Sequence, residues 1–388
     1  MILRIINHPY EFDMKNLCIT FFPHEKIRLE GEEDPVVVTT RRETDGSFFV
    51  SAKVYDVYRE TTAKPEPADE EHLVLSVTLY RLLSGILGFA PPWGVLYGVR
   101  PAKLMHRLCA QMGDDAAVAH FQTAFLTQKS KAELAHEVML HENRSIARSG
   151  PKSFSLYVSI PFCPTRCAYC SFVSHSIEKT HKLMTPYVDL LLRELEETAK
   201  YAKELGLELA TVYFGGGTPT TLSALDLGRI FSTIEQNFDL SHLMEYTVEA
   251  GRPDTVTRER LEVIRAAGVQ RISINPQSFN DKVLEAIGRR HTAQQTLDAF
   301  ALARDCGFDH INMDFIAGLP EDDLPSFQRS IQTALDLQAE SITVHTLALK
   351  TSAYMVTREQ TFDLKDRLTV SNMVDYAGQT LHGAGYYP

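Results

Sequence analysis

The chain has 388 residues, a formal charge of −11 at pH 7 and 44% hydrophobic residues, which suits two or three domains with substantial cores. The acidic balance argues against broad nucleic-acid binding, because that function needs a basic face. The sequence shows no secretory-leader pattern and no uninterrupted apolar stretch of membrane-spanning length. Its six cysteines are not spaced like a disulfide framework. We therefore expect a cytoplasmic protein without a membrane span.

Residues 1–68 are expected to form a β-rich N-terminal region. Runs rich in Val, Ile, Phe and Thr, bounded by polar turn residues, are typical of strands. Such runs lie at 3–7, 17–22, 35–40 and 47–58. The sequence TDGS at 44–47 contains the Asp-Gly pair of a hairpin turn.

Residues 69–150 are expected to form a helical region, broken where prolines cluster in FAPPWGVLYGVRPAK. His136 and His141 in its last helical pattern are five residues apart rather than four, so they do not match the paired-histidine motif of zinc proteases. We therefore interpret both as ordinary helical residues. Neither this region nor residues 1–68 carries a motif that we can assign to a function.

Residues 151–388 follow a different pattern, in which apolar strands alternate with amphipathic helices. This alternation predicts a parallel sheet with right-handed crossovers. The expected strands lie at 154–160, 209–215, 244–250, 269–275, 308–318 and 341–349. Six strand–helix units predict an α/β fold with an incomplete (β/α)6 barrel, preceded by the α+β N-terminal part. Barrels of this kind place their chemistry at the C-terminal ends of the strands.

Five unusual segments fall at these expected strand ends. They are the cysteine loop, GGGTP, EAGRPD, NPQSF and DFIAGLP. Their coincidence at one edge of a sheet predicts a functional site more strongly than any single motif does.

The loop SIPFCPTRCAYCSF holds Cys163, Cys167 and Cys170, whose spacing lets one tight loop direct three sulfurs at one centre. Thiolates suit zinc and iron–sulfur clusters. A structural zinc ion would need a fourth ligand, for which His175 is close in sequence. A [4Fe–4S] cluster held by three cysteines would instead leave one iron open to another molecule. Cys18, Cys109 and Cys306 are interpreted as small buried hydrophobic residues.

The spacing Cys-x-x-x-Cys-x-x-Cys, with an aromatic residue before the last cysteine, resembles the signature of radical S-adenosylmethionine (SAM) enzymes. The resemblance implies a [4Fe–4S] cluster on the three cysteines, with SAM chelated to the fourth iron. It also implies that one electron cleaves SAM to methionine and a radical that abstracts hydrogen, so an electron donor is expected as a partner.

The same resemblance implies the residues of the SAM site. Gly216, Gly217 and Thr218 match the loop that takes the methionine amino end, and Arg289 would pair with the SAM carboxylate. The other expected contacts are Tyr157, Tyr169, Glu249, Gln277, Asp314 and His345. Asp314 matches the acidic residue at the ribose and His345 a contact near the adenine. The two tyrosines could also be core aromatics and Glu249 a solvated carboxylate at the rim.

The motifs at 154–350 resemble the oxygen-independent coproporphyrinogen III oxidase family, and PPWGVLYGVRPAKLM resembles its HemZ-type branch. The resemblance implies oxidative decarboxylation of two propionates of coproporphyrinogen III to vinyl groups in heme biosynthesis, with an electron acceptor. Arg252, Arg290 and Lys350 are candidate partners of the propionates, although each is expected to be a surface charge.

Phe172 departs from the best-known decarboxylating type, which has a further cysteine there. The heme-chaperone branch also has Phe, so a heme-binding trafficking protein that retains the cluster is the alternative. A radical SAM enzyme acting on RNA is disfavoured by the acidic balance. The chain ends at GAGYYP where relatives usually continue, and we expect the C-terminal region of the family to be truncated.

Overall fold

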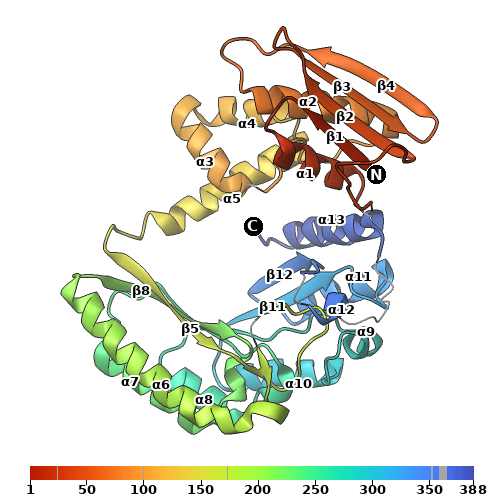
Figure 1. Ribbon diagram of the computed structural model, residues 1–388. Helices are drawn as coiled ribbons and strands as arrows, with labels where there is room; N and C mark the ends of the chain where they lie inside the picture. The colour runs from red at the N-terminus through yellow and green to blue at the C-terminus, as the bar shows by residue number, and fades with distance from the viewer. Residues whose placement is uncertain (24, 99, 173, 351–352, 358–364) are drawn as a thin grey trace. The chain divides into compact units, whose positions relative to one another are not determined.

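The computed structural model describes every residue except 24, 99, 173, 351–352 and 358–364. The described chain divides into two units, Met1–Arg148 and Ser149–Tyr387 (Figure 1). Within the described ranges, no helix combines the length and the apolar composition needed to cross a bilayer.

The first unit contains a four-stranded sheet in the order β1-β2-β3-β4, in which β1 pairs parallel with β2 and the other pairs are antiparallel. Its strands are β1 Ile2–Ile6, β2 Val36–Arg42, β3 Phe48–Val54 and β4 Val57–Ala63. The expected hairpin turn is present, because Glu43 N–H donates to Ser47 O and Gly46 takes φ +83°. The expected run 47–58 is two strands rather than one, since Tyr55 takes φ +51° and reverses the chain.

The strand expected at 17–22 is wrong, because these residues belong mainly to helix α1, Glu11–Phe21. The buried side chains of α1 are Met14, Leu17, Cys18 and Phe21, which follow the helical i, i+3, i+4, i+7 spacing. One apolar stripe packed against the core therefore outweighs the β propensity of the individual residues.

Helices complete the first unit as the composition of 69–150 predicts. They are α2 Glu71–Leu87, α3 Pro101–Met112, α4 Asp114–Thr123 and α5 Lys129–Ile146. Leu75 and Leu79 of α2 pack with Val38, Val50 and the other buried side chains of one sheet face. A smaller core joins α3, α4 and α5 around Met105, Phe121 and Met139.

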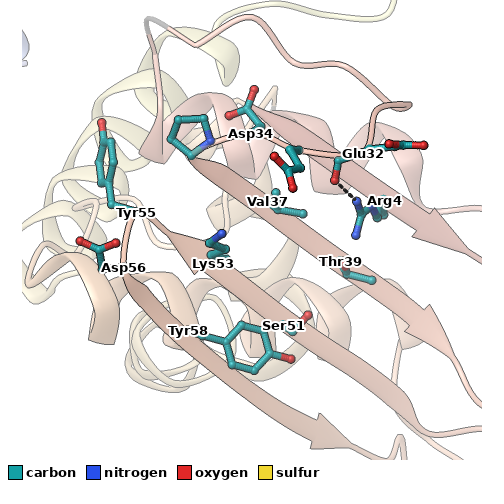
Figure 2. A pocket seen from close by; sticks show the side chains of 12 residues that line it. Arg4, Glu32, Asp34, Val37, Thr39, Ser51, Lys53, Tyr55, Asp56 and Tyr58 are labelled. Carbon is teal, nitrogen blue, oxygen red and sulfur yellow. Dashed lines mark hydrogen bonds between the residues drawn. The ribbon is translucent and has the colours of Figure 1, made fainter.

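The opposite face of this sheet is open and carries a hollow of about 880 Å³ (Figure 2). Thr39, Ser51, Lys53 and Tyr58 lie along its strands, and Arg4 donates to the carbonyl oxygen of Glu32 at the rim, at 3.0 Å. Lys53 and Tyr58 are exposed, so this hollow is a shallow surface.

The second unit confirms the predicted α/β fold. Its six-stranded sheet is parallel throughout, in the order β12-β11-β10-β9-β8-β5. The strands are β5 Ser153–Ile160, β8 Glu208–Gly216, β9 Glu245–Glu249, β10 Arg271–Ser273, β11 His310–Ala317 and β12 Ser341–Thr346. A short parallel pair, β6 Phe162–Cys163 and β7 His175–Ser176, frames the cysteine loop.

Helices α6, α7, α8 and α10 lie on one side of these strands in Figure 1. The α-helices of the unit are α6 Ile177–Glu204, α7 Ala224–Asn237, α8 Arg258–Ala266, α9 Asp281–Ala286, α10 Ala293–Asp305, α11 Leu324–Asp336, α12 Tyr354–Thr357 and α13 Arg367–Gly383. Two 3₁₀ turns, Pro219–Thr221 and Pro253–Thr255, follow β8 and β9. Side chains cap several helix starts, including a full capping box between Thr292 and Gln295, and each cap stabilises by about 1 kcal/mol.

Candidate active site

A cavity of about 440 Å³ lies in the second unit, where the cysteine loop meets the ends and neighbouring faces of the parallel strands. Every predicted site residue except Tyr157 lines it. These residues are Cys163, Cys167, Cys170, Tyr169, Gly216, Gly217, Thr218, Glu249, Gln277, Arg289, Asp314 and His345. Parallel strands explain this convergence, because their carboxyl ends meet at the same edge of a sheet.

The cysteine loop is anchored at several points of its backbone. Ala168 N–H donates to Ile287 O at 2.9 Å, and His175 N–H donates to Pro161 O at 2.8 Å. Cys163 and Cys167 are each only 9% exposed. Burial raises the pKa of the Cys163 and Cys170 thiols, and the neighbouring cysteines raise both pKa values further, so the sulfurs are close enough to repel as thiolates.

These sulfurs are nevertheless too widely spaced for one metal ion. Among the described residues, they do not form a trio whose ligand atoms all lie within 4.8 Å of one another. Sulfurs on a single tetrahedral zinc would stand about 3.8 Å apart. His175 is exposed and does not line the cavity. The wider spacing suits a cluster, in which each sulfur holds a different iron.

Arg252 stands against this loop and was wrongly expected to be a surface charge. Its side chain is 3% exposed. Nη1 donates to Cys167 Sγ at 3.6 Å, Nη2 donates to Thr165 Oγ1 at 3.1 Å, and Nε pairs with Asp254 Oδ1 at 3.1 Å. These contacts fix the guanidinium against the cysteine loop, with one of its N–H groups directed at the Cys167 sulfur. By contrast, Arg290 and Lys350 are exposed, and Arg290 pairs with Glu178 at 2.7 Å.

The glycine loop after β8 needs glycine for steric reasons. Gly216 takes φ +99°, and a Cβ at Gly217 would stand 2.6 Å from Phe162 O and 2.9 Å from Cys163 Sγ. Gly217 N–H donates to Ile160 O at 2.7 Å, and the Thr218 hydroxyl donates to Cys163 Sγ at 3.6 Å. This loop therefore runs directly beside the first cysteine, with no side chain between its backbone and the cavity.

Arg289 is buried in the wall of the cavity with part of its hydrogen-bonding capacity unused. Nη1 donates to Asn275 O at 2.7 Å, and Nη2 lies 3.4 Å from the hydroxyl of Tyr169. Its Nε and the Oδ1 atom of Asn275 are buried and make no hydrogen bond. A buried polar atom without a partner costs about 1–3 kcal/mol, so these atoms mark a place for a polar ligand.

Glu249, the last residue of β9, accepts a hydrogen bond from the Tyr213 hydroxyl at 2.6 Å. Burial is the main cause that raises the pKa of Glu249, and the carboxylate of Asp314 adds to it. Tyr157 stacks on Tyr213 with ring centroids 5.7 Å apart and is 58% exposed, outside the cavity lining. The structure therefore brings Glu249 to the site but places Tyr157 behind Tyr213.

Gln277 has the strained backbone that is typical of functional positions. It takes φ +67° although it is not glycine, which costs about 1–2 kcal/mol. Its N–H donates to Asp314 O at 2.9 Å, and its carbonyl accepts from Ile316 N–H at 3.2 Å, so strand β11 holds the conformation in place. The Asp314 carboxylate in turn accepts from Asn312 Nδ2 at 2.8 Å.

Further residues of the cavity were missed in the sequence. They include Tyr213, Arg271, Ser273, Asn275, Asn312 and Thr343. A signal was present, because alternate residues of a strand share a face. Asn312 lies two residues before Asp314 on β11, and Thr343 lies two before His345 on β12.

The cavity fits the two cofactors that its residues imply. Three separate thiols suit a cluster with one open iron, and the unpaired Arg289 Nε and the bare glycine backbone suit an amino-acid group beside it. An incomplete parallel barrel with this loop defines a radical SAM protein. The sequence-family model of the Radical SAM superfamily matches residues 157–334 of this chain. The cofactors of this protein are a [4Fe–4S] cluster and SAM.

More specific similarity extends over nearly the whole chain. It is 33% identical to the oxygen-independent coproporphyrinogen-III oxidase-like protein HemZ of Bacillus subtilis, over 97% of this chain and 78% of that protein. The heme chaperone HemW of Bacillus subtilis is 38% identical over 50% of this chain and 51% of its own length. The solved structure of coproporphyrinogen III oxidase (HemN) from Escherichia coli matches with a TM-score of 0.53 and 26% identity, covering 63% of this chain and 55% of that one. The chain belongs to the oxygen-independent coproporphyrinogen III oxidase-like family of radical SAM proteins.

Proposed function

We propose that this protein catalyses the oxygen-independent oxidative decarboxylation of coproporphyrinogen III to protoporphyrinogen IX in heme biosynthesis. The observation that carries the proposal is the convergence of three cysteines with Gly217, Glu249, Gln277 and Arg289 in one cavity. The relative that aligns over 97% of the chain is named as coproporphyrinogen-III oxidase-like, which supports this substrate over others of the superfamily.

When bound, the cluster and SAM would supply a hydrogen-abstracting radical by one-electron cleavage of SAM. In the proposal, Cys163, Cys167 and Cys170 would hold the cluster, and Arg252 donates a hydrogen bond to the sulfur of Cys167. Arg289 uses its free Nε to bind the SAM carboxylate, and Asp314 and His345 contact the adenosine end. An electron donor would be needed for the cluster, and an electron acceptor would take the electron that each decarboxylation releases.

Arg271 is our candidate partner for a substrate propionate. It lines the cavity and pairs with Glu245 at 3.3 Å, with the two side chains 34% and 44% exposed. An exposed ion pair of this kind stabilises by only about 0–1 kcal/mol, so a propionate can replace Glu245 at little cost. Arg252 and Arg289 also line the cavity, but their donors are largely engaged within the protein.

A heme-binding chaperone is the second candidate function. Phe172 favours it, because this side chain lines the cavity and is 61% exposed where the best-known decarboxylating type has a cysteine. An exposed aromatic ring offers a flat apolar surface suited to a porphyrin. The identity with the heme chaperone HemW, 38% over half of the chain, supports the same candidate.

An anaerobic assay separates the two. Reconstituted protein is incubated with SAM, a reductant, an electron acceptor and coproporphyrinogen III, and porphyrinogens are quantified after oxidation. We expect protoporphyrinogen IX in the wild-type protein and at least a tenfold higher KM in Arg271→Ala, with Arg290→Ala as the matched surface control. SAM cleavage and stable heme binding without any decarboxylation would contradict the proposal and support the chaperone.

A further inference from the structure

Three potential metal ligands meet in the first unit, on helices that carry no sequence motif. Cys109 lies in the last turn of α3, Asp114 is the first residue of α4, and His136 lies in the middle of α5. One ligand atom from each lies within 4.8 Å of the other two. Neither Cys109 nor His136 was given a role from the sequence, because they are 27 positions apart and the helix pairing that joins them is tertiary.

The positions of these atoms are compatible with a shared metal ion. His136 Nε2 lies 3.1 Å from Asp114 Oδ2, so the imidazole and the carboxylate already face each other. The third ligand atom, from Cys109, lies within 4.8 Å of both. On a tetrahedral zinc with bonds of about 2.0–2.2 Å, such a nitrogen and oxygen would stand roughly 3.3 Å apart.

The surroundings hold the three residues in place. Leu108 and Met105 of α3, Ala117 of α4 and Ala135 of α5 are buried in the small core that joins these helices. Cys109 and His136 are adjacent to two of these core residues in sequence, and the His136 side chain is 23% exposed while Asp114 is 55% exposed. The trio therefore stands at the edge of a packed core, with protein on one side and water on the other.

We propose that Cys109, Asp114 and His136 bind a zinc ion, with water as the fourth ligand. One thiolate, one imidazole and one carboxylate match the borderline-soft character of Zn²⁺. Calcium and magnesium are poor fits, since they take oxygen ligands and the trio offers a single carboxylate. The ion would connect α5 to the α3–α4 turn and so stabilise this helical part, independently of the cluster and of the substrate.

The test uses the full chain with its iron–sulfur cluster reconstituted anaerobically. The protein is equilibrated with zinc chloride and desalted, and iron and zinc are counted per chain. We expect one zinc in the wild-type protein and less than a tenth of that in Cys109→Ser and His136→Gln, with iron unchanged. Cys306→Ser is the matched control, because Cys306 is another partly buried free thiol, in the second unit.

Zinc-edge X-ray absorption identifies the ligands directly. The expected spectrum has one sulfur at about 2.3 Å together with nitrogen and oxygen ligands, whereas zinc bound adventitiously at the cysteine loop would have three sulfurs. His136→Cys should retain zinc with two sulfurs, which tests ligation even if another variant fails to fold. A wild-type protein without zinc, zinc retained in Cys109→Ser, or a three-sulfur spectrum would each overturn the proposal.

Discussion

The hollow on the N-terminal sheet and the cavity of the second unit differ in chemistry far more than in size. The hollow on the N-terminal sheet is the larger, about 880 Å³, but exposed side chains such as Lys53, Tyr55 and Tyr58 line it. The cavity of the second unit is about half as large, yet it contains buried thiols, a buried arginine with an unpaired nitrogen and a strained glutamine. Volume alone is therefore a poor guide to function in this molecule.

Strand direction explains the difference. In the second unit every neighbouring pair of strands is parallel, so loops that are distant in sequence converge on one edge. In the first unit β2, β3 and β4 are antiparallel, so successive strand ends point in opposite directions. The N-terminal hollow is accordingly lined largely by residues from strand faces and turns rather than by convergent loops.

Removal of one cysteine should give the largest contrast between the two regions. In Cys167→Ala we expect loss of nearly all iron and of SAM cleavage, because a [4Fe–4S] cluster on two thiolates lacks its third protein ligand. Iron content and 5′-deoxyadenosine formation after anaerobic reconstitution measure this. Lys53→Ala and Tyr58→Ala, on the N-terminal hollow, should retain both. A Cys167→Ala protein with full iron content would show that Cys167 is not a ligand of the cluster.

Replacement of a glycine by alanine should affect activity in the second unit but not in the first. Gly217→Ala forces a Cβ against Phe162 O and Cys163 Sγ, and such overpacking costs about 1–3 kcal/mol. Gly46→Ala in the N-terminal hairpin has φ +83° and no atom within 4 Å of the added Cβ, so it costs about 1–2 kcal/mol of backbone strain.

The two variants are thus matched in stability loss but not in their neighbours. We expect SAM cleavage to fall at least a hundredfold in Gly217→Ala and to stay unchanged in Gly46→Ala, with urea unfolding as the measure of stability. Equal activity in the two would mean that the glycine loop does not need to approach the cluster site.

Much of the second unit follows from the sequence, because its signals are local. The apolar strands, their alternation with helices and the spacing of Cys163, Cys167 and Cys170 are each contained within short stretches. The first unit was less predictable. Residues 17–22 have high β propensity, and only packing of Leu17 and Phe21 against the core makes them helical.

Tertiary contacts account for what the sequence did not reveal. Arginine is usually exposed, so the sequence favours a surface position for Arg252. Its burial against Cys167 depends on how two loops meet. The unpaired Nε of Arg289 likewise depends on where Asn275 and Tyr169 fall. Motifs located the three cysteines and the glycine loop, but the side chains that contact them come from other loops.

Replacement of Gln277 by glycine should separate stability from SAM binding. Gln277→Gly relieves a left-handed backbone, so the free energy of unfolding should stay constant or rise by about 1 kcal/mol. Loss of its amide from the cavity should weaken SAM binding at least tenfold, measured by equilibrium dialysis. Tyr55→Gly is the matched control at φ +51° in the N-terminal hairpin, and it should leave SAM affinity unchanged. If both variants bind SAM equally well, Gln277 has only a structural role.

The last expected effect is on stability alone and concerns two histidines, one buried in the second unit and one half-buried in the first. His291 is 2% exposed, neither ring nitrogen makes a hydrogen bond, and burial together with Arg289 and Arg252 lowers its pKa to about 3. The unfolded chain takes up a proton near pH 6.5 while the folded chain does not. Its contribution to stability is therefore fully present above pH 6.5 and is lost as the pH falls toward 3, by up to about 1.4 kcal/mol per pH unit.

His291→Met should remove this dependence, so urea unfolding between pH 7 and pH 5 should show a flatter decline than in the wild-type protein. Burial also lowers the pKa of His8 in the N-terminal unit, but Thr40 lies within hydrogen-bonding distance of its ring, at 3.0 Å, and the backbone contact with Thr40 opposes the shift. His8→Gln should consequently flatten the decline less. A steeper or unchanged decline in His291→Met would show that His291 is charged in the folded protein, and that the two cations beside it do not control its protonation.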